Sequence, residues 1–222
     1  MLEDTMKITN QRVRSLGRAL VLGIGLATVA TGQAAVLFDQ MSNPTATIIP
    51  SSWYAPDGLD GDTYSWDNFM LKLDSSVREV WWIGGGGNIS GVSVRFYEGL
   101  PAAPDYQPKI TALPESETSN DYLKGYKFTL SAMNATPLGN GLYKYHVTLP
   151  QPLHLPGKTV FWIKIEGDGS GSNSWGVVQS THGRDAMHFR FITGYLFQRI
   201  TGSLGFQLVG NPTTLSLIGP RP

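Results

Sequence analysis

Residues 142–149, LYKYHVTL, form the stretch of sequence that decides the fold. Aromatic and aliphatic side chains at positions 143, 145, 147 and 149 alternate there with Lys144, His146 and Thr148. Successive side chains of a β-strand point to opposite faces, so this alternation predicts a strand with one buried face and one face in water.

The same period of two recurs elsewhere in the chain. In residues 159–166, TVFWIKIE, the apolar positions 161, 163 and 165 are expected on the buried face, opposite Trp162 and Lys164 on the wet face. Nine further runs are expected to be strands: 36–39, 64–73, 77–83, 92–97, 126–130, 174–178, 188–191, 195–197 and 206–209. No segment after residue 35 keeps a 3.6-residue apolar period long enough for a substantial helix. The sequence therefore predicts an all-β protein, an antiparallel β-sandwich of jelly-roll type.

Gly-rich and Pro-rich segments mark the expected connections. Residues 139–141, GNG, favour a tight hairpin turn, because Gly and Asn tolerate positive φ. Residues 84–87, GGGG, are expected to form a flexible loop rather than a phosphate-binding loop, since no Lys or helix follows them. Residues 101–120 are polar and rich in Pro, and we expect this long connection to leave the sandwich as an exposed excursion.

The composition argues against several classes of protein. The 222 residues include 17 Lys or Arg and 17 Asp or Glu, so no net positive charge is available to displace counterions from nucleic-acid phosphates. The absence of Cys excludes a disulfide-stapled mini-protein, a Cys-ligated metal site and a thiol nucleophile. Apolar residues make up 41% of the chain, which argues against disorder.

The N-terminal segment is typical of a signal peptide. Three arginines between positions 12 and 18 precede an apolar stretch at 19–30, and small residues follow at 31–35. We expect cleavage after Ala34 or one residue later. The leader carries four of the 17 basic and two of the 17 acidic residues, so the mature chain has a net charge of −2. The apolar stretch is shorter than the roughly 20 residues that span a bilayer, so no stable membrane anchor is expected after cleavage.

The chain is expected to have three parts. Residues 1–35 form the signal-peptide helix, residues 36–210 a single β-sandwich domain, and residues 211–222 a disordered tail. This organisation predicts a secreted, extracellular protein that can associate with the cell surface.

Residues 52–67, SWYAPDGLDGDTYSWD, hold the densest group of polar and aromatic side chains. Asp57, Asp60 and Asp62 lie on a stretch punctuated by Gly, and Asp67 lies on the strand that follows. Closely spaced carboxylates on a bending loop supply the oxygen ligands that Ca²⁺ takes, so these four are candidate metal ligands. Their spacing does not match an EF-hand. The alternative is that Asp and Gly cluster there because they favour turns.

The aromatic residues of the same segment, Trp53, Tyr54, Tyr64 and Trp66, are candidates for binding a sugar. An aromatic face can pack on the apolar face of a pyranose while nearby Asp or Asn side chains take its hydroxyls. The alternative is that these rings belong to the core. The adjacent pair at positions 81 and 82, both Trp, must point to opposite faces, so the outward ring is a further candidate platform.

Signals for catalysis are weak. His182, Arg184 and Asp185 lie near Ser180, but the members of a catalytic triad come together in space rather than in one loop. There is neither a G-x-S-x-G nucleophile motif nor an H-E-x-x-H motif. A glycosidase needs two opposed carboxylates, and nothing in the sequence pairs Glu79, Glu98, Asp67 or Glu166. We therefore expect the protein not to be an enzyme.

Several short motifs resemble an uncharacterised bacterial exported β-sandwich domain. They are residues 66–69, WDNF, and 77–84, VREVWWIG, with further similarity at 37–40, 51–54 and 161–166. In that family an Asp-Asp/Asn-Phe strand precedes a Val-x-x-Val-x-Trp-x-Gly strand. The resemblance covers most of the mature chain and implies an exported β-sandwich.

The C-terminal residues 211–219, NPTTLSLIG, resemble the start of a PEP-CTERM sorting tail. In that tail a Pro-Glu-Pro motif precedes a Thr-Thr-Leu-Ser-Leu-type run, an apolar helix and an Arg cluster. Here Gly210-Asn211-Pro212 replaces Pro-Glu-Pro, and the sequence reaches Pro222 without the helix or the Arg cluster. The resemblance implies export to the cell surface and association with extracellular polysaccharide or biofilm matrix. The departures imply release rather than anchoring.

Taken with the weak catalytic signals, these patterns favour a non-catalytic extracellular or cell-surface matrix protein. Its expected partner is an extracellular polysaccharide, bound by the sandwich as a glycan-binding module, or a matrix protein. One alternative is a structural component that binds itself or other proteins through exposed edge strands. Another is a hydrolase that acts on polysaccharide.

Overall fold

The computed structural model describes residues 34–41, 44–54, 62–110, 122–169, 175–192 and 197–213. All of them belong to one unit that spans residues 32–222. Several expected features lie outside the described residues: the leader up to residue 33, Asp57 and Asp60, and the tail from residue 214 onward.

The first sheet contains eight strands. Its main path is β1 (Ala35–Asp39), β16 (Phe206–Pro212), β5 (Ser75–Gly86), β10 (Leu142–Leu155) and β9 (Asn134–Gly139). A branch pairs β12 (Trp175–Ser180) with β5, β2 (Pro44–Pro50) and β15 (Ser203–Leu204). Strand β16 continues to Pro212, past the Gly210 at which we expected the domain to end.

The second sheet also contains eight strands. Its path is β14 (Gln198–Thr201), β13 (Met187–Ile192), β4 (Thr63–Met70), β3 (Ser52–Tyr54), β11 (Val160–Gly169), β6 (Ile89–Leu100) and β7 (Ala103–Pro108). Strand β4 also pairs directly with β11, and β8 (Lys124–Thr129) pairs with β6. A single 3₁₀ turn, Leu130–Ala132, follows β8.

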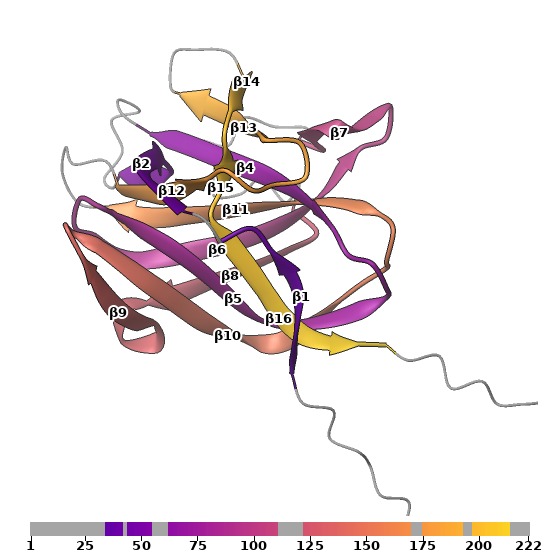
Figure 1. Ribbon diagram of the computed structural model, residues 1–222, viewed down its shortest axis with the longest axis horizontal. Helices are drawn as coiled ribbons and strands as arrows, with labels where there is room; N and C mark the ends of the chain where they lie inside the picture. Colours follow the sequence, from indigo (N-terminus) through magenta and orange to yellow (C-terminus); the bar gives the residue numbers. More distant parts are fainter. Residues whose placement is uncertain are drawn as a thin grey trace, which may run out of the picture. The chain divides into compact units, whose positions relative to one another are not determined.

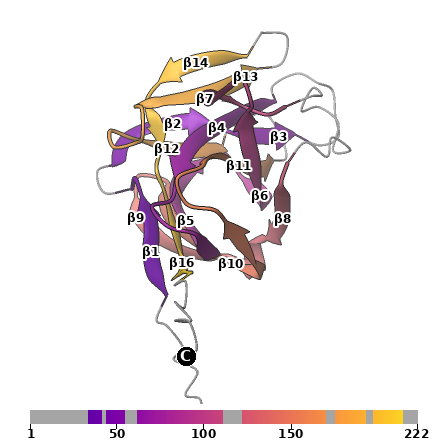
Figure 2. The same cartoon turned by 90° about the vertical axis from the view of Figure 1, so that its right-hand side faces the viewer.

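The prediction of an all-β protein is confirmed, since the described residues contain no α-helix. The two curled sheets face each other, with β5, β10 and β16 on one side and β4, β6 and β11 on the other (Figures 1 and 2). Within the described ranges, all strand pairs are antiparallel except β3 with β11, which run parallel.

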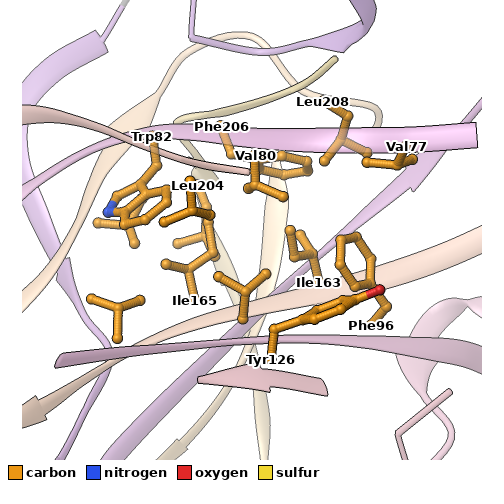
Figure 3. Close-up of a cluster of buried hydrophobic side chains, with 14 of the residues drawn as sticks. Val77, Val80, Trp82, Phe96, Tyr126, Ile163, Ile165, Leu204, Phe206 and Leu208 are labelled. Atoms are coloured by element: carbon orange, nitrogen blue, oxygen red, sulfur yellow. The ribbon is translucent and has the colours of Figure 1, made fainter. Parts of the chain in front are cut away.

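The main core fills the space between the sheets. Figure 3 shows Val77, Val80 and Trp82 of β5 pointing toward Ile163 and Ile165 of β11. All five side chains are buried completely. Burying one large apolar side chain contributes about 1.5–3 kcal/mol relative to leaving it in water. These inward positions therefore hold the two sheets together.

Strand β10 has the predicted alternation from Lys144 to Leu149, but Tyr143, which was expected on the buried face, is 39% exposed beside the hairpin. Tyr145, Val147 and Leu149 are buried, whereas Lys144 and His146 are partly exposed on the other face. The hairpin before it is also confirmed, since β9 pairs with β10 around residues 139–141. All three have positive φ, +89°, +52° and +74° in chain order, which is the conformation that Gly and Asn adopt most readily.

The expectation of a wet face on β11 is wrong. Phe161, Ile163 and Ile165 do face the main core, but Trp162 and Lys164 on the opposite side are 0% and 1% exposed. A second cluster of buried aromatic residues covers that side; its members are Tyr64, Trp66, Tyr97, Trp162, Phe189 and Phe191. Strand β11 is therefore buried on both faces.

The expected flexible loop at residues 84–87 is also a misreading. Gly84, Gly85 and Gly86 complete strand β5, and the first two are buried. A Cβ on Gly84 would lie 2.7 Å from the carbonyl oxygen of Gly176, and one on Gly85 would lie 2.5 Å from that of Gly141. Because β10 and β12 approach β5 so closely on its two sides, these positions accept only glycine.

Candidate functional site

The aromatic residues predicted to bind sugar lie mainly in the second cluster. Tyr64 and Trp66 are each 1% exposed. The ring of Trp66 lies 6.0–6.2 Å from those of Tyr97, Phe189 and Phe197. Tyr64 and Trp66 therefore pack as core residues and do not form an open wall.

Trp53 is partly buried and packs against the same cluster. The side chain of Tyr54 lies outside the described residues.

Of the four aspartates predicted to bind Ca²⁺, the structure describes Asp62 and Asp67, and these two lie on different faces of the second sheet. Asp62 is buried and accepts a hydrogen bond from the Tyr64 hydroxyl at 2.9 Å. Asp67 projects to the opposite face, where its oxygens accept hydrogen bonds from Gln40 Nε2 (2.8 Å) and the backbone N–H of Leu204 (2.6 Å). Among the described residues no three acidic or His side chains are grouped as a metal site. Burial raises the pKa of Asp67 well above its ordinary value, against the effect of these hydrogen bonds.

A buried group of charges lies beside the second cluster. Lys164 is 1% exposed, forms an ion pair with Glu166 and lies 4.2 Å from the centre of the Tyr64 ring. Arg95 approaches the same carboxylate at 3.6 Å. Burial lowers the pKa of Lys164 to about 8, although the charge of Glu166 opposes this shift. Burial raises the pKa of Tyr64, and the carboxylates of Glu166 and Asp62 add to the shift.

The tryptophan pair on β5 divides as the sequence predicts. Trp82 is buried in the core, and Trp81 points outward from the first sheet, partly exposed. The Trp81 ring stacks on His146 with ring centres 4.1 Å apart, and its Nε1 donates to Glu79 at 2.9 Å. The Nζ of Lys144 lies 4.9 Å from the ring centre. Trp81 is thus already engaged by three polar neighbours.

An open hollow lies where β7 meets β13 and β14, three strands that lie close together in both views (Figures 1 and 2). It measures about 760 Å³, and its lining residues are Asp105, Tyr106, Arg184, Asp185, Met187 and Arg199. Tyr106 is 54% exposed and carries the guanidinium of Arg199 at 5.1 Å from its ring centre. The hollow therefore combines an accessible aromatic ring with charged hydrogen-bonding groups.

Two ion pairs fix the charged groups of this hollow. Arg184 Nη1 lies 2.6 Å from Asp105 Oδ1, and Arg199 Nη2 lies 2.5 Å from Asp185 Oδ2. The first pair joins residues 79 positions apart in sequence, and the second joins residues 14 positions apart. Two positive and two negative charges are present, so the hollow has no net charge.

Buried side chains beneath the hollow anchor its two walls. Asn68, which is buried on β4, donates from Nδ2 to Asp185 Oδ2 at 2.8 Å and to the carbonyl oxygen of Asp105 at 3.2 Å. Trp162 on β11 donates from Nε1 to the carbonyl oxygen of Pro104 at 2.9 Å. These contacts attach β7 to the second sheet and hold the site in one shape.

The sequence contains signals for parts of this hollow, but none that predicts that they come together. Arg184 and Asp185 belong to the segment considered for catalysis, where His182 donates its backbone N–H to Ser180 Oγ at 3.0 Å rather than presenting its ring to that hydroxyl. Asp105 and Tyr106 belong to the Pro-rich connection, which forms strand β7 over residues 103–108. The length and composition of that connection were the available signal.

No helix among the described residues is long and apolar enough to cross a membrane. No family model, curated protein or solved structure matches this chain.

Proposed function

We propose that this protein is an exported, non-catalytic glycan-binding β-sandwich of jelly-roll type, and that it acts in the extracellular or cell-surface matrix. The signal-peptide pattern of the first 35 residues and the similarity of residues 211–219 to a PEP-CTERM tail support export and a matrix location. The glycan contact is the hollow around Tyr106, not the buried rings of Tyr64 and Trp66.

The observation that carries the proposal is the exposed Tyr106 ring among fixed charged groups. A sugar ring has an apolar C–H face and a rim of hydroxyls. The Tyr106 ring can pack against the C–H face. Hydroxyls can donate hydrogen bonds to the carboxylates of Asp105 and Asp185 and accept them from the guanidinium groups of Arg184 and Arg199. The balanced charges favour an uncharged polyhydroxyl ligand over a phosphate or a nucleic acid.

Substitution of Tyr106 tests this assignment. The secreted protein is incubated with immobilised polysaccharides and with a glycan array, and the Tyr106→Ala variant is expected to lose its binding. Tyr143→Ala is the matched control, since Tyr143 is also partly exposed (39%) but lies on β10 of the first sheet. Absence of binding to any glycan, or equal binding by the Tyr106→Ala variant, refutes the assignment.

A hydrolase is the second candidate function. Asp105 and Asp185 line the same hollow, and a pair of carboxylates is what glycoside hydrolysis requires. Each carboxylate is held by an arginine, an arrangement that suits a fixed hydrogen-bond acceptor better than a proton donor. Release of reducing sugar from a bound polysaccharide, abolished in Asp185→Asn, would establish the hydrolase instead.

Self-association is favoured by one edge of the first sheet. Strand β9 lies at the end of that sheet and is exposed along its whole length, with Leu138 51% exposed. Such an edge can pair with another strand. Concentration-dependent assembly in analytical ultracentrifugation without glycan, prevented by Leu138→Lys, would establish this function.

Calcium binding is proposed for Asp57, Asp60 and Asp62. Asp62 is buried at the start of β4, and its carboxylate already orders the Tyr64 hydroxyl. Asp67 is excluded from the proposed ligand set because its oxygens are hydrogen-bonded on the opposite face of the sheet.

A further inference from the structure

Three hollows of the surface meet at Arg184. The first is the hollow around Tyr106, about 760 Å³. The second, about 650 Å³, continues from Arg184 and Asp105 toward the connection between β10 and β11. The third, about 450 Å³, lies between Arg184 and the end of β1. A pocket for one small molecule measures about 300–1,000 Å³, so the three together exceed what a single sugar fills.

The second hollow adds apolar walls to the polar groups of the first. Its apolar lining includes Met70, Leu123, Leu155, Val160 and Phe161. Exposed polar side chains, among them His154 and Thr159, stand beside these walls. A succession of polar and apolar surfaces matches a chain of pyranose rings, which presents C–H faces and hydroxyl edges in turn.

The charges are balanced in each hollow. In the second, Glu98 and Asp105 are matched by Lys158 and Arg184. In the third, Asp39 is matched by Arg184. Because Arg184 and Asp105 are shared, the three hollows together carry four acidic and three basic residues, the acids being Asp39, Glu98, Asp105 and Asp185 and the bases Lys158, Arg184 and Arg199. With no excess of positive charge, nothing along this path selects an acidic polysaccharide over a neutral one.

Arg184 occupies the shared position of the three hollows. Its side chain is 25% exposed and uses Nη1 to bind Asp105. A guanidinium has five N–H donors in a fixed plane, so others remain to contact a ligand that passes over it.

We propose that the three hollows form one groove for an internal stretch of an uncharged polysaccharide, with Arg184 at its centre. This inference rests on the proposed function and adds the class of ligand. The protein would then bind along the length of a polymer rather than bind a single sugar or the end of a chain.

The dependence of affinity on chain length tests the inference. Isothermal titration compares two-unit and six-unit oligosaccharides of β-1,4-linked glucose, xylose and N-acetylglucosamine, together with hexagalacturonate as the acidic probe. We expect at least one neutral six-unit chain to bind about tenfold more tightly than its two-unit form, because the longer chain reaches more than one hollow. Hexagalacturonate is expected not to bind.

A variant that blocks the second hollow tests whether the higher affinity for the six-unit chain arises there. Thr159→Trp places a bulky side chain in the second hollow and is expected to reduce affinity for the six-unit chain about fivefold, leaving two-unit binding unchanged. Thr148→Trp, an exposed position on the first sheet, is the control. Near-UV circular dichroism confirms that both variants are folded.

The possible results distinguish failure of the groove from failure of glycan binding at Tyr106. Equal affinity for two and six units, or an unaffected Thr159→Trp variant, overturns the groove and leaves glycan binding at Tyr106 intact. Tight binding of hexagalacturonate overturns the uncharged ligand. Failure of every neutral six-unit chain to bind overturns the groove, and binding of no glycan on the array overturns the glycan-binding function as well.

Discussion

The buried amide of Asn68 donates a hydrogen bond to the carboxylate of Asp185 at 2.8 Å, although 117 positions separate the two residues in sequence. The same Nδ2 reaches the carbonyl oxygen of Asp105 at 3.2 Å. One side chain on β4 thus holds both the segment before β13 and strand β7. The shape of the surface hollow therefore depends on a residue that does not line it.

Replacement of Asn68 by Ala is expected to weaken both the fold and the site. Asp185 and the β7 backbone each lose a buried donor, so we expect the free energy of unfolding to fall by about 1–3 kcal/mol. Affinity for glycan falls as well, because the two walls of the hollow are no longer fixed. Urea unfolding and glycan titration measure the two effects. The control is Asn88→Ala, an exposed position between β5 and β6, and an equal loss there would contradict the role given to Asn68.

The adjacent tryptophans of β5 provide a comparison of inward and outward positions. Trp82 is buried in the core, so Trp82→Ala is expected to reduce the free energy of unfolding by about 3–5 kcal/mol. Trp81 is partly exposed and stacks on His146, so Trp81→Ala is expected to cost about 1 kcal/mol or less. Thermal and urea unfolding measure both.

The Trp81→Ala variant also decides between two surfaces. With the glycan site at Tyr106, this variant keeps its full affinity for polysaccharide. Loss of binding in Trp81→Ala, with Tyr106→Ala unaffected, would move the site to the outer face of the first sheet.

The strand pattern could be predicted because burial on one face leaves a period of two in the sequence. Residues 142–149 show this, and the observed β10 begins at the same residue. The alternation in β11 was misleading because both faces of this strand are buried. Lys164 suggests a wet face by its chemistry, whereas the fold pairs it with Glu166 beneath aromatic rings. Local sequence carries no sign of the segment that covers a strand.

The candidate site could be predicted only in fragments. Asp105 and Arg184 are 79 positions apart, and their ion pair depends on how β7 folds back on the second sheet. The glycines at 84–86 misled in a related way, since a Gly run is typical of a loop. In this fold the absence of side chains at these glycines allows β10 and β12 to approach β5 closely. In both cases the deciding contact is long-range, and no periodicity reports it.

Calcium is expected to stabilise the folded protein if Asp57, Asp60 and Asp62 bind it. A ligand that binds only the native state raises the free energy of unfolding by RT ln(1 + [L]/Kd). The melting temperature should therefore be higher in about 5 mM CaCl₂ than in EDTA. The Asp60→Asn substitution should remove this increase. MgCl₂ at the same concentration controls for ionic strength. Identical melting in calcium and in chelator would discard the metal site.

Lys164 is expected to make the protein more stable as the solution becomes moderately alkaline. Its pKa is lowered by burial from 10.5 to about 8 in the folded state. Below pH 8 the side chain is protonated in both the folded and the unfolded states. Between about pH 8 and 10.5 the unfolded chain keeps a proton that the native state loses, so the free energy of unfolding increases with pH. At pH 9.5 the gain amounts to about 2 kcal/mol relative to pH 7.

At still higher pH the free energy of unfolding no longer increases, because other groups begin to ionise. Burial raises the pKa of Tyr64 and of Tyr97 above the ordinary 10.0, so their ionisation in the unfolded chain lowers stability above about pH 10. Burial also raises the pKa of Asp67, which acts equally in every variant, so the difference in urea unfolding between the native protein and a Lys164 variant between pH 7 and 9.5 isolates the lysine. In Lys164→Met the rise should vanish, whatever that variant's stability at pH 7, while the exposed-lysine variant Lys72→Met should keep it. A rise that survives in Lys164→Met would show that another group titrates in this range and that Lys164 stays charged inside the fold.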